Sequence, residues 1–279
     1  MIKLFASDLD GTLLNATHMV DPFIRASLRE VVASGAHFAI ATGRTMRSNH
    51  DCGFGGVDAE VVCSNGSIVL DRTGRTVYHR DLDKGFLEEL LKAFPAVCFE
   101  CVGTDRTYVT GSPNDQVAGY VGRTPVEKVK MAAMRLRRKM MQGDCEFNQG
   151  VRDVLRRDIC KVNARVNDKA LERELHAFMD EHAAMAVNAP FSPVMFEITA
   201  AGVNKASALA WLAGYLGIGE DEVAVYGDGG NDLVMLERFA HSYAPSNACD
   251  AAKRAAGRVI GSCACYAVPR HMVATVRAQ

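Results

Sequence analysis

The chain of 279 residues is long enough for two domains, and its 48% hydrophobic and 23% charged residues are typical of a globular protein. A net charge of -1 gives no indication of nucleic acid as a partner, and no apolar run approaches the ~20 residues that span a membrane. The chain enters a predicted strand without the charged and apolar regions of a signal peptide, so we expect a cytoplasmic protein.

The first third of the sequence predicts strands that alternate with a helix, which is typical of a parallel α/β sheet. Two of its predicted strands end at Thr42-Gly43-Arg44 and Ser64-Asn65-Gly66. Asn65-Gly66 is equally consistent with a simple hairpin turn. The predicted elements are strands over 2–7, 37–41, 60–63, 68–70 and 77–79, and a helix over 22–34 with proline in its first turn.

The middle of the chain has a different pattern. The stretch Ile159–Val166 alternates apolar or small residues with polar ones, which predicts a strand in an antiparallel sheet with one covered face. The basic run Arg135–Lys139 is expected to be the solvated face of a helix. The other predicted elements are helices over 86–94, 124–141 and 171–179, strands over 97–101, 107–109 and 194–198, and a loop over 111–115.

The parallel-sheet pattern returns near the end of the chain. We therefore expect a Rossmann-like α/β core formed by residues 1–82 and 199–279, with an α+β unit inserted over 83–198. The predicted elements of this last part are helices over 209–216, 233–239 and 268–278 and strands over 223–226, 243–244 and 259–260.

The nine cysteines are odd in number and irregularly spaced, so we expect reduced thiols rather than a disulfide framework. Cys98 and Cys101 have the spacing of a zinc-binding pair, and Cys263 and Cys265 form a second close pair. A zinc site needs two well-formed pairs or added histidines, so buried thiols are the favoured interpretation.

Polar groups of complementary types follow several predicted strands. Asp8 and Asp10 follow the first strand, and Asp228 lies in the loop after the strand over 223–226. Reactive groups collect outside the carboxyl ends of parallel strands, and clustered carboxylates repel one another without a cation, for which Mg²⁺ is suited. A lysine, a hydroxyl and free amides would hold a phosphoryl group, and a carboxylate can attack one. The pattern indicates Mg²⁺-assisted attack on a phosphate ester.

Each of these groups also has a purely structural interpretation. Asp8 and Asp10 could close a strand with an Asx-type turn, and Thr42-Gly43 could be a turn of its own. Lys205 could be a cation at a helix start, and Asn231 could cap a helix. Their joint occurrence in a fixed order favours the chemical interpretation.

That order resembles the haloacid dehalogenase superfamily. Asp8-Leu9-Asp10-Gly11-Thr12 is similar to its DxDGT nucleophile motif, and the other three motifs are matched in turn by ATGR with Thr42, GVNKASAL with Lys205, and GDGGND with Asp228. An insert between the second and third motifs resembles the Cof-type branch of sugar-phosphate phosphatases, in which the insert is a C2-type α/β cap. The resemblance covers essentially the whole chain.

The resemblance implies a role for each matched residue. Asp8 would attack phosphorus and become an aspartyl phosphate, and Asp10 would protonate the leaving oxygen and then deprotonate water. Mg²⁺ would bind the Asp8 carboxylate, the Asp10 backbone carbonyl and Asp228. Asp232 would orient Lys205 or a water on the metal. The groups that would hold the phosphoryl oxygens are Thr42, the Gly43 amide, Lys205 and Asn231.

Arg44 and Asn65 are further candidates for substrate contacts, with a surface arginine and a turn asparagine as the structural alternatives. The segment around Asn247 and the tail over 261–268 depart from the usual family pattern. In the cap, Asn163 and Arg165 are polar residues without an assigned role.

The sequence therefore predicts a Mg²⁺-dependent phosphatase that acts on a small phosphorylated metabolite, with a cap that selects the leaving group and closes over the site. A phosphomutase acting on hexose phosphates and a catalytically silent phosphate-binding module are the alternatives. Neither the particular metabolite nor the oligomeric state is predicted.

Overall fold

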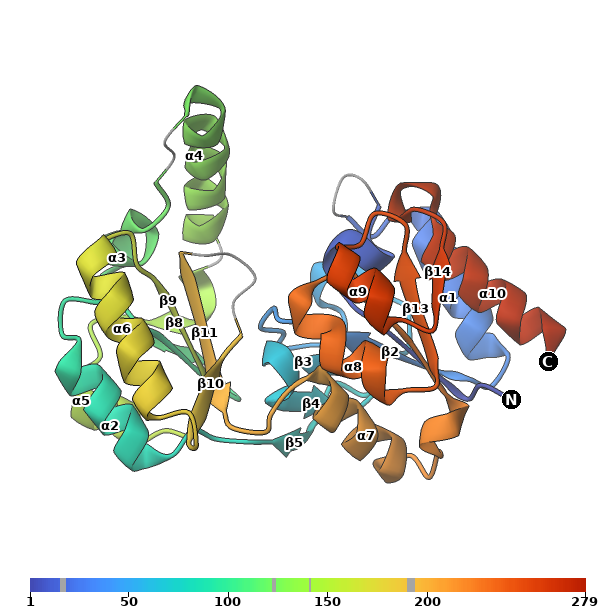
Figure 1. Cartoon of the computed structure of the whole chain (residues 1–279), viewed down its shortest axis with the longest axis horizontal. Helices are drawn as coiled ribbons and strands as arrows, with labels where there is room; N and C mark the ends of the chain where they lie inside the picture. The colour runs from blue at the N-terminus through green and yellow to red at the C-terminus, as the bar shows by residue number, and fades with distance from the viewer. Residues whose placement is uncertain (16–18, 122–123, 141, 190–193) are drawn as a thin grey trace. The chain divides into compact units, whose positions relative to one another are not determined.

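The computed structural model describes residues 1–15, 19–121, 124–140, 142–189 and 194–279. The chain divides into two compact units, of which the first combines Met1–His79 with Val203–Gln279 and the second is Arg80–Gly202. We call them the core unit and the inserted unit. Figure 1 shows the core unit in the blue and red ends of the colour range and the inserted unit in green and yellow. The sequence predicts the two boundaries between these units at 82/83 and 198/199.

The core unit is built on a sheet of eight strands in the order β14-β13-β12-β1-β2-β3-β4-β5. Neighbouring strands from β14 to β3 are parallel, whereas β4 and β5 are antiparallel. The strands are β1 (Leu4–Ser7), β2 (His37–Ala41), β3 (Glu60–Cys63), β4 (Ile68–Leu70), β5 (Thr76–His79), β12 (Val223–Tyr226), β13 (His241–Pro245) and β14 (Arg258–Ile260). This sheet confirms the predicted α/β fold.

Helices cover both faces of the core sheet, because its strands are apolar on both sides. On one face α7 (Lys205–Tyr215), α8 (Leu233–Arg238) and α9 (Asp250–Ala255) pack on strand residues such as Leu4 and Ala39. On the other, α1 (Pro22–Ala33) packs with α10 (Ala267–Ala278) and against β2. Asp21 caps α1 by accepting the Ile24 N–H, and Pro22 starts the helix as its sequence predicts.

The inserted unit has a six-stranded sheet in the order β10-β11-β9-β6-β7-β8. All of its pairs are antiparallel except β7–β8. The strands are β6 (Glu100–Gly103), β7 (Thr107–Val109), β8 (Cys145–Glu146), β9 (Ile159–Arg165), β10 (Ala186–Asn188) and β11 (Met195–Ala200), and the helices are α2 (Lys84–Ala93), α3 (Pro113–Ala118), α4 (Pro125–Met140), α5 (Val151–Leu155) and α6 (Lys169–Glu181). Phe86 of α2 contacts Phe178 of α6, so these helices pack together.

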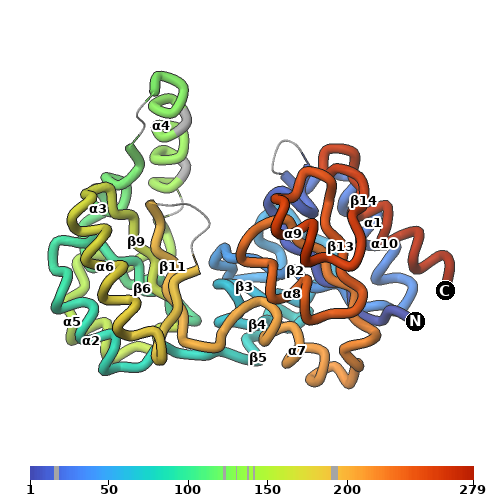
Figure 2. The backbone as a smooth tube through the Cα atoms, in the orientation of Figure 1, coloured from blue at the N-terminus to red at the C-terminus, as the bar shows by residue number. Residues whose placement is uncertain are grey.

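Figure 2 traces the chain from β5 into the inserted unit and from β11 back to α7. Several predictions for the inserted unit need correction. The strand expected over 97–101 begins only at Glu100, and the expected loop over 111–115 contains the start of α3, where Ser112 and Asp115 form a capping box. Lys161, expected on an open face, is 1% exposed. Met141, the expected end of a helix, lies outside the described residues.

Candidate active site

The nucleophile motif forms a tight turn at the carboxyl end of β1. Asp8 directly follows the last strand residue, Ser7, and its carbonyl accepts a hydrogen bond from Leu13 N–H at 3.2 Å. Gly11 lies in the left-handed region with φ 82°, and a Cβ at this position would lie 2.3 Å from Asp228 Oδ2. Glycine is therefore required here both by the backbone conformation and by the close approach of a second acidic residue.

Lys205 joins two buried carboxylates. Its Nζ donates to Asp8 Oδ1 at 2.6 Å and to Asp232 Oδ1 at 2.7 Å. The lysine is 1% exposed and comes from the first turn of α7, which the Asn204 side chain caps through Ser207 N–H. Because β1 and β12 are parallel neighbours, the loops that follow them bring Asp8 and Asp232 together from distant parts of the sequence.

The loop after β12 is held by the second of these acids. Asp232 Oδ2 accepts hydrogen bonds from the backbone N–H groups of Asp228 at 3.0 Å and Gly229 at 2.9 Å. Thr12 Oγ1 donates to Asp228 Oδ1 at 2.7 Å and thereby links the nucleophile turn to this loop. Asp232 thus positions both Lys205 and the backbone that carries Asp228.

The electrostatics of this cluster follow from its burial. Carboxylate oxygens of Asp8, Asp228 and Asp232 lie within 4.8 Å of one another. Burial raises the pKa of Asp8 to about 7, with the Lys205 ammonium acting in the opposite direction and Asp232 adding to the increase. Burial likewise raises the pKa of Asp228. Lys205 has a raised pKa because, although burial lowers it, the charges of Asp232 and Asp8 outweigh that effect.

Asp10 has a different environment from Asp8. Arg44 donates two hydrogen bonds to the Asp10 carboxylate, from Nε to Oδ2 at 2.8 Å and from Nη2 to Oδ1 at 2.5 Å. The Asp10 side chain is 44% exposed, so it is the more accessible of the two acids. The sequence predicts Arg44 as a candidate substrate contact but does not predict this pair, whose partners are 34 residues apart. The one indication in the sequence is that Asp10 and Arg44, which carry opposite charges, each follow a predicted strand.

The turn after β3 supports the turn after β2. Ser64, Asn65 and Gly66 are consecutive residues in the left-handed region, with φ of 52°, 58° and 100°. Asn65 N–H donates to Thr42 O at 3.1 Å, and Ser64 N–H donates to Arg44 O at 2.9 Å. Asn65-Gly66 therefore lies in a β3–β4 hairpin turn, as its alternative interpretation predicts, and this turn also braces the candidate phosphate-binding residues.

Side-chain packing places Asn65 beside two other predicted site residues. It is 3% exposed, and its Oδ1 accepts a long hydrogen bond from Asn231 Nδ2 at 3.5 Å. A Cβ on Gly43 would lie 2.7 Å from the same oxygen, so glycine allows the two turns to approach. The strand ends thus bring Thr42, Gly43, Asn65 and Asn231 together.

Asn247 connects the nucleophile turn to the atypical tail. Its Nδ2 donates to Gly11 O at 2.7 Å, and its Oδ1 accepts from Cys263 N–H at 2.9 Å. The sequence places Asn247 in a segment that departs from the usual family pattern, and it does not predict this bridging contact.

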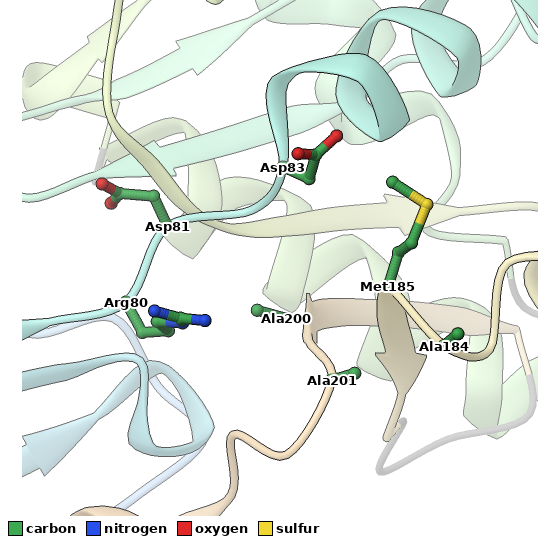
Figure 3. A pocket seen from close by; sticks show the side chains of 7 residues that line it. All are labelled: Arg80, Asp81, Asp83, Ala184, Met185, Ala200 and Ala201. Atoms are coloured by element: carbon green, nitrogen blue, oxygen red, sulfur yellow. The ribbon is translucent and has the colours of Figure 1, made fainter.

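A hollow of about 420 Å³ lies elsewhere, in the inserted unit. Figure 3 shows Arg80, Asp81 and Asp83 on one of its sides and Met185 with three alanines on the other. Asp83 caps α2 through the Phe86 N–H, and Asp81 accepts a hydrogen bond from the Cys160 thiol. These acids have structural partners, and the hollow contains none of the predicted catalytic residues.

The fold and the acidic cluster together define a hydrolase of the haloacid dehalogenase type. The model of the haloacid dehalogenase-like hydrolase family matches residues 5–269, so the chain belongs to that family, as its four motifs predict. A haloacid dehalogenase-like hydrolase from B. subtilis has the same fold, with a TM-score of 0.81 and 23% identity over 97% of this chain and 99% of its own.

Two curated relatives are named as phosphatases. An HMP-PP phosphatase of Citrobacter koseri is 27% identical over 89% of this chain and 85% of the relative. A 5-amino-6-(5-phospho-D-ribitylamino)uracil phosphatase of Escherichia coli is 27% identical over 94% of this chain and 91% of the relative. Within the described ranges, every helix is too short or too polar to cross a membrane.

Proposed function

We propose that this protein is a Mg²⁺-dependent phosphatase that hydrolyses phosphate monoesters of small metabolites through an aspartyl-phosphate intermediate. The observation that carries the proposal is the buried bridge from Lys205 to Asp8 and Asp232. A lysine that only stabilised the fold would not require three carboxylates close together, since buried like charges are costly. The phosphatase names of the relatives support the same reaction.

The two acids of the first motif divide the chemistry. An Asp8 oxygen forms a bond to phosphorus while the ester P–O bond breaks, and Asp10 gives a proton to the leaving oxygen. Asp10 then takes a proton from water, whose oxygen attacks phosphorus, releases phosphate and restores the Asp8 carboxylate. The support for this division is the contrast between buried Asp8, held by Lys205, and half-exposed Asp10, held by Arg44.

The phosphoryl group is held by the groups around Asp8. Lys205 neutralises charge on its oxygens, and the Thr42 hydroxyl, the Gly43 amide and Asn231 donate hydrogen bonds to them. Asn65 keeps the Gly43 turn in position through its backbone bond to Thr42.

The residues present fit Mg²⁺. Lys205 hydrogen bonds to Asp8 and Asp232, whereas Asp228 accepts from the uncharged Thr12 hydroxyl, so the three clustered carboxylates retain uncompensated negative charge when ionised. Hard, anionic oxygen donors are those that Mg²⁺ prefers. The Asp8 and Asp228 carboxylates and the Asp10 backbone carbonyl would hold the ion. When bound, it supplies positive charge that orients and neutralises a phosphate ester.

The polar face of the inserted sheet supports selection of a polar substrate. Lys161 of β9 pairs with Glu197 of β11, and Asn163 and Thr199 are their neighbours on the same face. Within the described part of the chain, Asn163 Oδ1 and Thr199 Oγ1 are buried without a hydrogen-bond partner. Buried polar atoms favour a bound partner. We therefore assign to this face the recognition of the hydroxyl or amide groups of the substrate.

The test is phosphate release from a panel of sugar phosphates, phosphorylated polyols and pyrimidine phosphates, with Mg²⁺ and with EDTA. We expect release only with Mg²⁺, and none from the Asp8→Asn variant. Conversion of a hexose phosphate to its isomer without free phosphate would indicate a phosphomutase instead. Tight phosphate binding without turnover of any panel member would indicate a binding module.

A further inference from the structure

Helix α4 carries an apolar seam that the described residues of its own unit leave exposed. Figure 1 shows the helix extending away from the sheet of the inserted unit. Its start is fixed by a capping box, in which Thr124 Oγ1 accepts from Glu127 N–H and Glu127 Oε2 accepts from Thr124 N–H. Near its end, Arg138 donates to Glu100 at 2.7 Å and anchors the helix to β6.

The seam has the spacing of a helix–helix contact. Val126, Val129, Ala133, Leu136 and Met140 follow one another at intervals of three and four residues. Val126, Val129, Leu136 and Met140 are 79%, 73%, 64% and 80% exposed. Met131, Met134 and Arg138, on the other side, are half-buried and face the unit. A strict alternation of three and four is the pattern of a coiled-coil seam rather than of a helix that packs broadly on a core.

The charge beside the seam is strongly basic. The helix has six lysines and arginines and a single acidic residue, whereas the whole chain has a net charge of -1. Exposed Lys128, Arg135 and Lys139 run along one side of the seam. A hollow of about 280 Å³ borders the same side and is lined by Tyr120, Val121, Lys128, Met131, Ala132 and Arg135. It offers a place for an anchoring side chain between two cationic groups.

We propose that this face, comprising the α4 seam and the adjacent hollow, docks an acidic amphipathic helix of a partner protein. The partner presents apolar residues at the same alternating spacing, with glutamates or aspartates beside them. A second copy of this chain is disfavoured because two basic helices would repel each other. A lipid surface is disfavoured because α4 has no aromatic residue and its apolar strip is narrow, unlike interfacial helices.

The probe is a synthetic helix of about 20 residues with leucines at alternating intervals of three and four and flanking glutamates. Its lysine-flanked counterpart is the matched control. We expect fluorescence anisotropy to show binding of the acidic peptide alone to the full chain. The dissociation constant should rise about tenfold or more between about 0.05 M and about 0.5 M NaCl. No binding of the acidic peptide, or equal binding of both, overturns the proposal.

Variants localise the contact. Val129→Asp with Leu136→Asp should weaken acidic-peptide binding about tenfold or more, since both side chains lose their apolar contact. Val259→Asp, an exposed valine in the core unit, should leave binding unchanged. Lys128→Glu with Arg135→Glu should transfer the preference to the basic peptide. Binding that persists in the Val129/Leu136 variant contradicts the assignment.

The other possible occupants are tested with the same proteins. A dimer in light scattering that the Val129/Leu136 variant abolishes, or sedimentation with phosphatidylserine vesicles stronger than peptide binding, would each replace the proposal. Phosphate release should be the same in all these variants, because none of the substituted residues belongs to the proposed catalytic or phosphate-binding groups. The result for the peptide therefore stands whether or not the proposed phosphatase activity is found.

Discussion

Replacing Lys205 with methionine keeps most of the side-chain volume and removes its charge. The ammonium makes hydrogen bonds of 2.6 and 2.7 Å to Asp8 and Asp232, and all three residues are buried. Hydrogen bonds to charged groups contribute about 1.5–3 kcal/mol each, and breaking a buried ion pair costs about 3–5 kcal/mol. Two buried carboxylates without their partner should therefore lower the free energy of unfolding by about 3–5 kcal/mol.

Equilibrium urea unfolding measures this change through the chain's one tryptophan, Trp211, which lies in α7 of the core unit. Adding Asp232→Asn should recover part of the loss, because it removes one uncompensated charge and keeps an oxygen for the loop amides. A loss below about 1 kcal/mol for Lys205→Met would show that the carboxylates do not depend on the ammonium, and would refute the electrostatic argument.

Two further predictions concern single side chains. Arg44→Ala should lower kcat about tenfold or more with alkyl phosphates, because Asp10 then loses the group that positions it for proton transfer. The loss should be smaller with nitrophenyl phosphate, whose leaving group needs little protonation by Asp10. Equal losses with the two substrates in steady-state assays would mean that Arg44 does not act through proton transfer by Asp10. Burial raises the pKa of Asp21, but hydrogen bonds from Tyr266 and the α1 backbone outweigh it and lower the pKa. The Asp21 contribution to stability is thus present above its unfolded pKa and lost as pH falls through the folded value. Asp21→Ala should cost about 1 kcal/mol at neutral pH, and urea unfolding should show a smaller cost near pH 3.

The core fold was predictable because its signals are local. Each strand of the parallel sheet is a short apolar run that stops at a glycine or polar group, and β1 ends at Ser7, directly before Asp8, as the sequence predicts. The α1 start was equally visible, since Asp21 and Pro22 occupy their preferred cap positions. Such preferences depend on a few neighbouring residues and need no tertiary information.

The missed features depend on distant pairing. No periodicity indicates that Arg44 reaches Asp10 or that Asn247 bridges Gly11 and Cys263. Lys161 is buried beside Glu197 of the neighbouring strand, with which it forms an ion pair. The alternation of residues within its own strand gives no information on that partner. The catalytic roles of the site residues came from the resemblance and are still proposals.

The strand order also constrains how the protein is made. β1, at the beginning of the chain, pairs with β12, whose loop supplies Asp228 and Asp232. The described strands of the inserted unit pair with one another within one continuous segment, so this unit can fold while the ribosome is still producing the rest of the chain. The acidic cluster cannot form until the last quarter of the sequence has been made. Because β1 and β12 are far apart in the sequence, their pairing closes a long loop, which favours slow folding of the core unit. A nascent chain that ends before β12 therefore lacks the acidic cluster, even when its amino-terminal strands are complete.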